Sequence, residues 1–212
     1  MASEQTIIKR RQKTIYGIFI DGIALDRAGR RIGKKVSLDK LVSTLAPTNC
    51  VVKRYYTVIP HQDDARHLSF IDSIRNRGFR VTVKRLLPKN VERTVTADVE
   101  IASDIIAFAY TNPSVFDCLD VTSSEKGRKG GIGKAASSAA AAEADNIKEA
   151  VYKKIVIVCP SGELYYPVNL IRHNCKNAEI IAADFGKFSN RNIIAIAHSW
   201  FDLSDSQTIW KE

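Results

Sequence analysis

Apolar residues follow two patterns along the chain: short unbroken runs, and longer segments in which they recur every three or four positions. The first run, Thr14–Gly22 (TIYGIFIDG), is rich in β-branched and aromatic residues. Such a run predicts a strand that is buried on both faces, as in the middle of a parallel sheet. Asp21 falls at the carboxyl end of this predicted strand, beside a glycine at which the backbone can turn.

Four further runs predict strands, and the periodic segments predict helices between them. The predicted strands are Cys50–Ile59, Phe79–Leu86, Lys154–Cys159 and Ala178–Ala182. The predicted helices are Leu38–Leu45, Asp64–Arg77, Asp98–Tyr110 and Tyr165–His173, and Asn192–Ala197 is a last helix or strand. Residues 23–37 are rich in glycine and basic residues and are predicted to be a loop. Strands that alternate with helices predict an α/β fold with a central, mainly parallel sheet.

The length and composition fit one compact domain with a sizeable core. The chain has 212 residues, of which 45% are hydrophobic and 26% charged. Residues 1–13 predict a basic, loosely ordered arm, and the domain is expected to cover residues 14–205. Residues 111–150 break the pattern with a stretch that is rich in Gly and Lys and then in Ala, and we interpret it as a low-complexity insertion.

The insertion contains the string GRKGGIGK, which does not meet the spacing of a phosphate-binding loop. Arg128 stands where the pattern GxxxxGK[ST] needs its first glycine, and Ala135 stands where it needs Ser or Thr. Two interpretations of the insertion stay open: a solvated linker, and a basic flap that contacts phosphates.

The charge of the chain is strongly positive. The formal net charge is +9 at pH 7 and the sequence pI is about 9.4, which favours polyanion partners, nucleic acid first. Two basic clusters flank the first predicted strand, so both are expected near Asp21. The clusters are Lys9, Arg10, Arg11 and Lys13 before the strand, and Arg27, Arg30, Arg31, Lys34 and Lys35 after it.

The spacing of the cysteines and the length of the apolar runs indicate in which cellular compartment the protein is expected. The four cysteines are widely spaced and form no CxxC pair, which argues against a zinc site and against a disulfide scaffold. No apolar run is long enough to cross a membrane, and residues 1–14 contain no apolar stretch of signal-peptide length. We therefore expect a cytoplasmic protein without a membrane partner.

Acidic residues fall where a parallel sheet would gather them. Asp21 ends the first strand, Asp98 begins a helix, Asp104 follows six residues later, and Glu163 follows the fourth strand. Carboxylate oxygens are the ligands of hard cations such as Mg²⁺ and Mn²⁺, which serve phosphodiester hydrolysis. Asp21 as a turn cap and Asp98 in a favourable helix dipole are the alternative explanations, whereas Asp104 lies in mid-helix and has none of this kind.

Several stretches together resemble a known family. They are FIDG (19–22), the strand around Tyr55 and Tyr56, FIDSIRNRGFRVTVKRL (70–86), ADVEIASD (97–104), IVIVCPSGELYYPVNLIRHN (155–174) and HSWFDL (198–203). From about Thr14 to Leu203 the chain resembles an NYN domain of the LabA-like kind, within the PIN-like nuclease superfamily. The resemblance implies a PIN-like, Rossmann-like three-layer α/β sandwich with a central, mainly parallel sheet, and metal-dependent cleavage of RNA.

The resemblance also assigns site residues. Asp21 matches the acid of the first strand, and Asp98 and Asp104 match the two acids of the helix, so these three would hold Mg²⁺ or Mn²⁺. The chain departs from the family after the fourth strand, where the family pattern SGDxDF carries two acids. Gly162 and Leu164 stand at those two positions, and Glu163 between them is a substitute ligand in our hypothesis.

Two hypotheses follow. The first is a Mg²⁺- or Mn²⁺-dependent endoribonuclease with Asp21, Asp98, Asp104 and Glu163 as catalytic residues, and Arg30, Arg31, Lys34 and Lys35 binding the phosphates of RNA. The second is a degenerate NYN domain that binds RNA or a protein partner without cutting. A nucleotide-binding Rossmann enzyme is disfavoured because no GxGxxG follows the first strand. A protein partner and a homo-oligomer are left open by the sequence.

Overall fold

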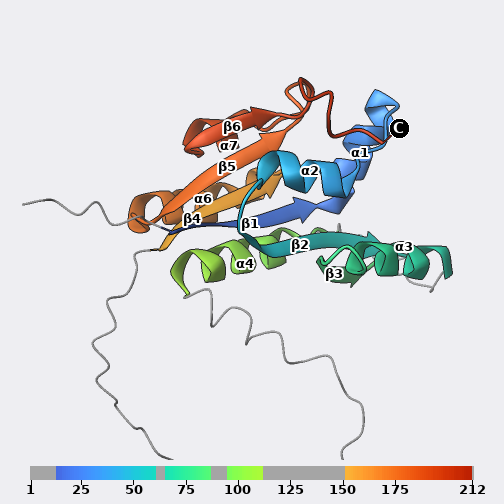
Figure 1. Cartoon of the computed structure of the whole chain (residues 1–212), viewed down its shortest axis with the longest axis horizontal. Helices are drawn as coiled ribbons and strands as arrows, with labels where there is room; N and C mark the ends of the chain where they lie inside the picture. The colour runs from blue at the N-terminus through green and yellow to red at the C-terminus, as the bar shows by residue number, and fades with distance from the viewer. Residues whose placement is uncertain (1–12, 61–64, 87–94, 112–150, 212) are drawn as a thin grey trace, which may run out of the picture.

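The computed structural model of the chain describes residues 13–60, 65–86, 95–111 and 151–211 (Figure 1). The predicted basic arm and the predicted insertion lie outside these residues, apart from Lys13 and Thr111. Both therefore stay predictions.

A parallel sheet forms the centre of the described structure (Figure 1). Its six strands lie in the order β3-β2-β1-β4-β5-β6, and every neighbouring pair is parallel. The strands are β1 (Lys13–Asp21), β2 (Cys50–Ile59), β3 (Arg80–Arg85), β4 (Val151–Val158), β5 (Ala178–Asp184) and β6 (Ser199–Asp202). The predicted α/β fold with a central, mainly parallel sheet is confirmed, and β6 is a strand that we did not predict.

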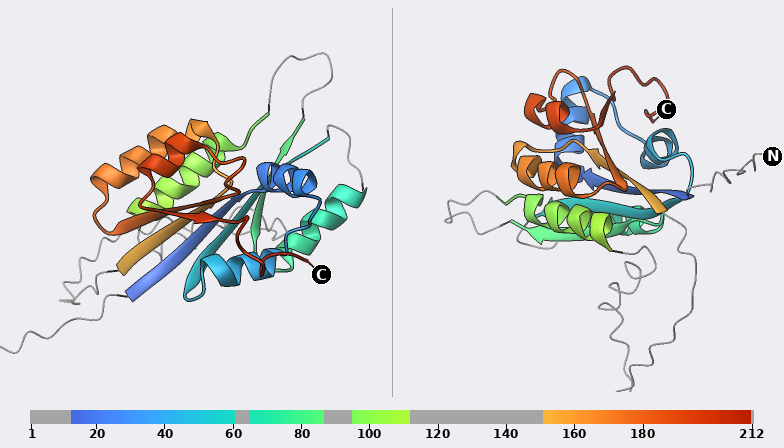
Figure 2. Two further views of the ribbon diagram at one scale, coloured as in Figure 1. Left: turned by 90° about the horizontal axis from the view of Figure 1, so that it is seen from above. Right: turned by 90° about the vertical axis from the view of Figure 1, so that its left-hand side faces the viewer.

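Helices cover both faces of the sheet, which gives the predicted three layers (Figure 2). One face carries α1 (Gly22–Ile32), α2 (Leu38–Leu45) and α3 (Ala65–Arg75), and the other carries α4 (Asp98–Tyr110), α6 (Tyr165–Asn174) and α7 (Arg191–Ile196). A short 3₁₀ turn, η2 (Gly162–Leu164), precedes α6. None of the helices in the described part of the chain is both long and apolar enough to cross a membrane.

The apolar run of β1 supplies both cores, as its pattern predicts. Ile15 and Phe19 pack into the core beneath α4 and α6, whereas Ile18 and Ile20 pack into the core beneath α1 and α2. Successive side chains of a strand point to opposite faces, so an unbroken apolar run is what a strand covered on both faces requires.

The predicted loop at residues 23–37 is wrong, because most of it forms α1. Asp21 caps the start of this helix, and Leu25 and Ala28 are buried on its inner face. Gly33 ends it in the left-handed conformation with φ of 75°. The helix therefore brings the second basic cluster to the carboxyl end of β1.

The order of the strands places a crevice between β1 and β4. The chain leaves β1 toward β2 and β3, and then returns along α4 on the opposite face to reach β4. In open α/β sheets a ligand site forms at the carboxyl ends of the strands on either side of such a switch point.

Candidate active site at the switch point of the sheet

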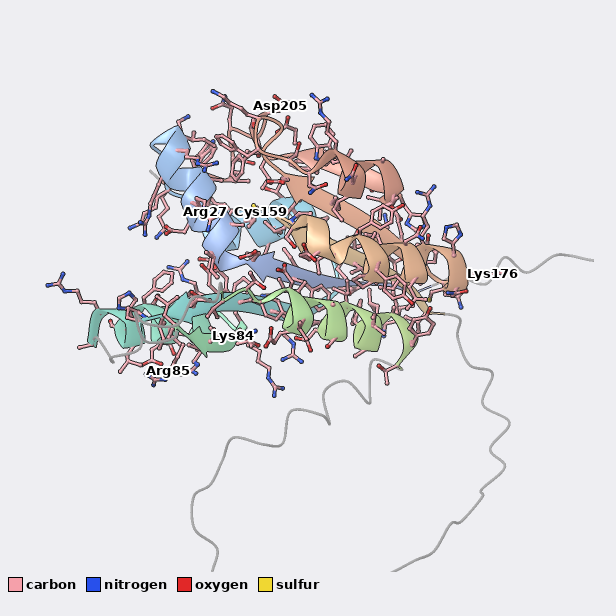
Figure 3. All side chains as sticks on the ribbon, turned by 180° about the vertical axis from the view of Figure 1, so that it is seen from behind. Arg27, Lys84, Arg85, Cys159, Lys176 and Asp205 are labelled. Atoms are coloured by element: carbon pink, nitrogen blue, oxygen red, sulfur yellow. The ribbon has the colours of Figure 1, made fainter. Side chains whose placement is uncertain are left out.

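A cavity of about 340 Å³ opens at the carboxyl ends of β1, β4 and β5. We call it the acidic cavity. Its polar lining residues are three acids, two arginines, two hydroxyl residues and a cysteine: Asp21, Asp98, Asp184, Arg27, Arg31, Thr96, Ser161 and Cys159. Figure 3 labels Arg27 and Cys159 at this end of the sheet, with Lys176 at the opposite end.

Asp21 has two roles at the end of β1. One of its oxygens, Oδ1, accepts hydrogen bonds from the backbone N–H groups of Ile23 and Ala24, both at 3.0 Å. Burial raises the pKa of this carboxyl, and the charge of Asp98 raises it further, against the opposing effects of the two N–H donors and Arg27. Asp21 can therefore cap α1 and also serve in a binding site, since its Oδ2 makes neither of the two capping hydrogen bonds.

Asp98 is the first residue of α4 and is buried, with 9% of its surface exposed. The hydroxyl of Ser161, just after β4, donates a hydrogen bond to its Oδ1. The helix N-terminus favours a negative charge at this position. This contact ties the start of α4 to the segment after β4 and holds the carboxylate at the cavity wall.

Asp184 is a cavity acid that the sequence analysis missed. It is the last residue of β5 and is buried, and its Oδ1 accepts a hydrogen bond of 2.8 Å from the N–H of Phe185. Burial raises its pKa, as do the charges of Asp202 and Asp21, while the Phe185 N–H and the Cys159 thiol lower it. An apolar run followed directly by an acid, the pattern that singled out Asp21, is also present in IIAAD.

Asp104 does not line the acidic cavity. It forms a separate group with two residues of β2, which we call the α4–β2 cluster: Tyr56 donates to Asp104 Oδ2 at 2.6 Å, and Arg54 Nε lies 3.8 Å from the same oxygen. Burial, the charge of Asp104 and this hydrogen bond all raise the pKa of Tyr56. A buried phenol and a buried guanidinium thus account for this mid-helix acid.

Glu163 does not line the cavity either. It lies exposed in η2, and Leu164 beside it is completely buried. The segment after β4 therefore contributes the hydroxyl of Ser161 to the cavity rather than a carboxylate.

The predicted phosphate-binding residues extend from the cavity along α1. Arg31 lines the acidic cavity, and Arg30 and Lys35 line the hollows beside it. Lys34 lines the hollow farthest along α1 and lies over the ring of Trp210, 5.3 Å from its centroid.

The acids fit a partly hydrated hard cation better than a closed protein shell. Among the described residues, no three His, Cys, Asp or Glu side chains form a group that could hold a metal ion. Mg²⁺, however, commonly binds one or two carboxylates and keeps several waters. Asp21 and Asp98 both supply hard oxygen donors, and they lie close enough together for the charge of Asp98 to raise the pKa of Asp21. The donor chemistry therefore fits such an ion.

Comparison with known proteins gives one family and one structure. The profile of the family described as "NYN domain" matches residues 16–128, which is more than half of the chain. The crystal structure of a protein of unknown function from Vibrio parahaemolyticus has a similar fold, with a TM-score of 0.64 and 14% sequence identity over 100% of both chains. No curated protein matches the sequence at a significant level.

Proposed function

Since this chain belongs to the NYN domain family and has its PIN-like nuclease fold, we propose that it is a metal-dependent endoribonuclease. The observation that carries the proposal is the acidic cavity, in which three carboxylates from β1, α4 and β5 face two arginines of α1. The net charge of +9 fits a polyanionic substrate.

Asp21 and Asp98 would bind a partly hydrated Mg²⁺ or Mn²⁺ in this cavity, and Asp184 would contact the waters of the ion. A bound ion of this kind lowers the pKa of a coordinated water and neutralises charge on a phosphodiester. Ser161 would fix the orientation of Asp98 through their hydrogen bond. The cap of α1 would fix that of Asp21 in the same way.

Arg27 and Arg31 would bind the phosphate at the cavity. Both side chains extend from α1 into its lining, on the side where the cavity continues toward the other basic residues. A guanidinium offers a fork of N–H donors that matches phosphate oxygens. The arginines would therefore hold the scissile phosphate against the three carboxylates.

The test is cleavage of a labelled single-stranded RNA in Mn²⁺ by the wild-type protein and by Asp21→Asn. Asn caps a helix about as well as Asp, so the variant keeps α1 and loses only the charge. We expect cleavage by the wild type, its loss in EDTA, and its loss in Asp21→Asn. Asp72→Asn is the matched control, because Asp72 is an exposed acid of α3 that pairs with Arg75. Full cleavage by Asp21→Asn would refute the metal-binding role.

A second candidate function is RNA binding without cleavage. It is favoured by the segment after β4, where Gly162 and Leu164 stand at the acidic positions of the family pattern and Glu163 is exposed. Fewer carboxylates mean weaker binding of a divalent ion. A wild-type protein that binds RNA with a steep dependence on salt, but does not cut it in Mn²⁺, would establish this alternative.

A further inference from the structure

A groove lined by basic residues continues from the acidic cavity across the face of α1 toward α3. Two hollows of about 530 and 680 Å³ form it, and they share Asp26, Arg30, Lys35, Tyr55 and Phe70. We call it the α1–α3 groove. The larger hollow also shares Ile23, Arg27 and Arg31 with the acidic cavity, so the groove and the cavity are continuous.

The charge of the groove suits a nucleic-acid backbone. Besides Arg27 and Arg31, its lining includes five basic residues: Arg30, Lys34, Lys35, Arg77 and Lys211. Its one acidic lining residue, Asp26, is paired with Arg30 at 2.7 Å. An excess of cations along a groove that leads to a phosphodiester site would hold the phosphates on one side of the cut.

One aromatic side chain lies open in the middle of these cations. Phe70 on α3 is 49% exposed and belongs to both hollows of the groove. Its ring meets that of Tyr55 edge-on, with centroids 6.4 Å apart and planes at 74°. Tyr55 is itself buried against Gly22, where an added Cβ would lie within 2.5 Å of the tyrosine ring. The phenyl ring is therefore held at its edge by a fixed neighbour.

We propose that the α1–α3 groove binds the single-stranded segment of RNA next to the cleaved bond, with an unpaired base stacked on Phe70. The proposal rests on the proposed function, since the acidic cavity defines where the bond is cut. Stacking requires a base that is not covered by neighbours in a duplex, so the groove would select single strands. The pairing of an aromatic platform with flanking cations is the arrangement that single-stranded nucleic acid needs.

Binding of a fluorescent single-stranded RNA in EDTA tests the groove without any cleavage. Phe70→Leu removes the aromatic face but keeps an apolar side chain, and we expect the Kd to rise about 5- to 100-fold. Phe70→Trp restores an aromatic face and should bind at least as tightly as the wild type. Leu68→Ala is the matched control, because Leu68 is 44% exposed on the same helix and lines neither hollow. Thermal melts of all variants establish that they are folded.

The cations and the strandedness give two further readouts of the same experiment. Lys35→Ala should lower the slope of log Kd against log salt by about one, whereas Lys176→Ala, at the opposite end of the sheet, should leave it unchanged. A blunt RNA duplex of the same sequence should compete poorly for the labelled single strand.

The outcomes separate this inference from the proposed function. The proposal that the groove binds single-stranded RNA would be overturned by any of three results. These are unchanged binding by Phe70→Leu, equal competition by the duplex, and no binding of RNA by the wild type. Absence of cleavage in Mn²⁺ together with a loss of binding in Phe70→Leu would refute the nuclease and leave the groove established.

Discussion

Asp98 and Asp104 lie six residues apart on α4, and their carboxylates meet different surroundings. Asp98 faces the acidic cavity with Asp21 and Asp184, and within the described residues none of these three acids forms an ion pair within 4 Å. Asp104 has its cation within the fold, because Arg54 lies 3.8 Å away and Tyr56 donates to the same oxygen.

The difference indicates which acids the chain neutralises by itself. In the α4–β2 cluster the protein supplies both a positive charge and a hydrogen-bond donor, so nothing further is needed to offset the burial of Asp104. In the acidic cavity burial and like charges raise the pKa of Asp21 and of Asp184, which shows that their negative charge is disfavoured there. A cation from outside would remove that cost, which is the behaviour we propose for the cavity.

Cleavage should respond most strongly to substitution of a cavity acid. Asp184→Asn should lower kcat by about 100-fold or more, because it removes a charge from the cavity that we propose binds the ion. Asp104→Asn should change kcat by less than about threefold, because Asp104 lies outside the cavity. Single-turnover cleavage of a labelled RNA in Mn²⁺ measures both variants. The reverse order of effects would support the prediction from sequence that Asp104 is a ligand.

Of these two variants, Asp104→Asn should cause the larger loss of stability. Asp104→Asn weakens the contacts of a buried phenol and a buried guanidinium, and we expect a loss of about 1–3 kcal/mol in the free energy of unfolding. The midpoint of thermal unfolding should fall by about 2–4 °C for each kcal/mol. A double-mutant cycle with Tyr56→Phe tests the origin of the loss, because coupled neighbours deviate from additivity by about 0.5–3 kcal/mol. Strictly additive losses would contradict the described cluster.

The apolar pattern of the sequence predicted most of the architecture, but it did not predict the helix α1. Cys50–Ile59 and Leu38–Leu45 were predicted with the bounds that the structure gives them, since a proline or a polar segment marks their ends. The buried stripe of α1 consists of Leu25, Ala28 and two glycines. Because it contains so few large apolar residues, and basic residues lie between them, the sequence shows no clear helical period here. A Cβ added to Gly29 would lie 2.9 Å from the backbone oxygen of Lys34, so the turn that closes α1 requires a glycine at this position.

The site was harder to predict than the fold, because the spacing of two residues in the sequence does not show on which side of an element each side chain lies. Six residues along an α-helix correspond to about 9 Å and about 120° around the axis, so Asp98 and Asp104 lie on different sides of α4. Asp184 was missed because the predicted fifth strand ended at Ala182, which placed this acid beyond the strand instead of at its carboxyl end. Only the order of the strands brings it beside Asp21.

The two groups of acids should also differ in how they make the stability of the fold depend on pH. The folded-state pKa values of Asp21 and Asp184 are raised, so between the ordinary carboxyl pKa of about 3.9 and the raised values the folded state binds more protons than the unfolded state. Stability in EDTA should therefore fall as pH rises through the raised values. Asp184→Asn removes one of these charges and should melt higher than the wild type near pH 7, with the two converging in acid.

Divalent ions should cancel this penalty. At ten times its Kd, Mn²⁺ is expected to stabilise the wild type by about 1.4 kcal/mol, and the effect should diminish in acid as protons compete for the carboxylates. Asp104→Asn should keep this shift, whereas Asp21→Asn and Asp184→Asn should lose most of it. Thermal melts with and without Mn²⁺ at several pH values measure it. An equal shift in all four proteins would mean that the ion binds elsewhere.

Substitution of Glu163 should have little effect, although it is the one acid that the chain retains in the segment where the family pattern carries two. Its side chain is exposed, and it lies in the turn η2, in which the Leu164 N–H donates to the backbone carbonyl of Ser161. The burial of Leu164 fixes this turn, and Glu163 does not line the cavity, so Glu163→Gln should change the cleavage rate by less than about twofold. The matched variant Ser161→Ala removes the hydroxyl that holds Asp98 and should have the larger effect. If Glu163→Gln instead lowers cleavage more than Ser161→Ala does, the turn must rearrange when RNA binds, and the acid would return to the position that the family pattern gives it.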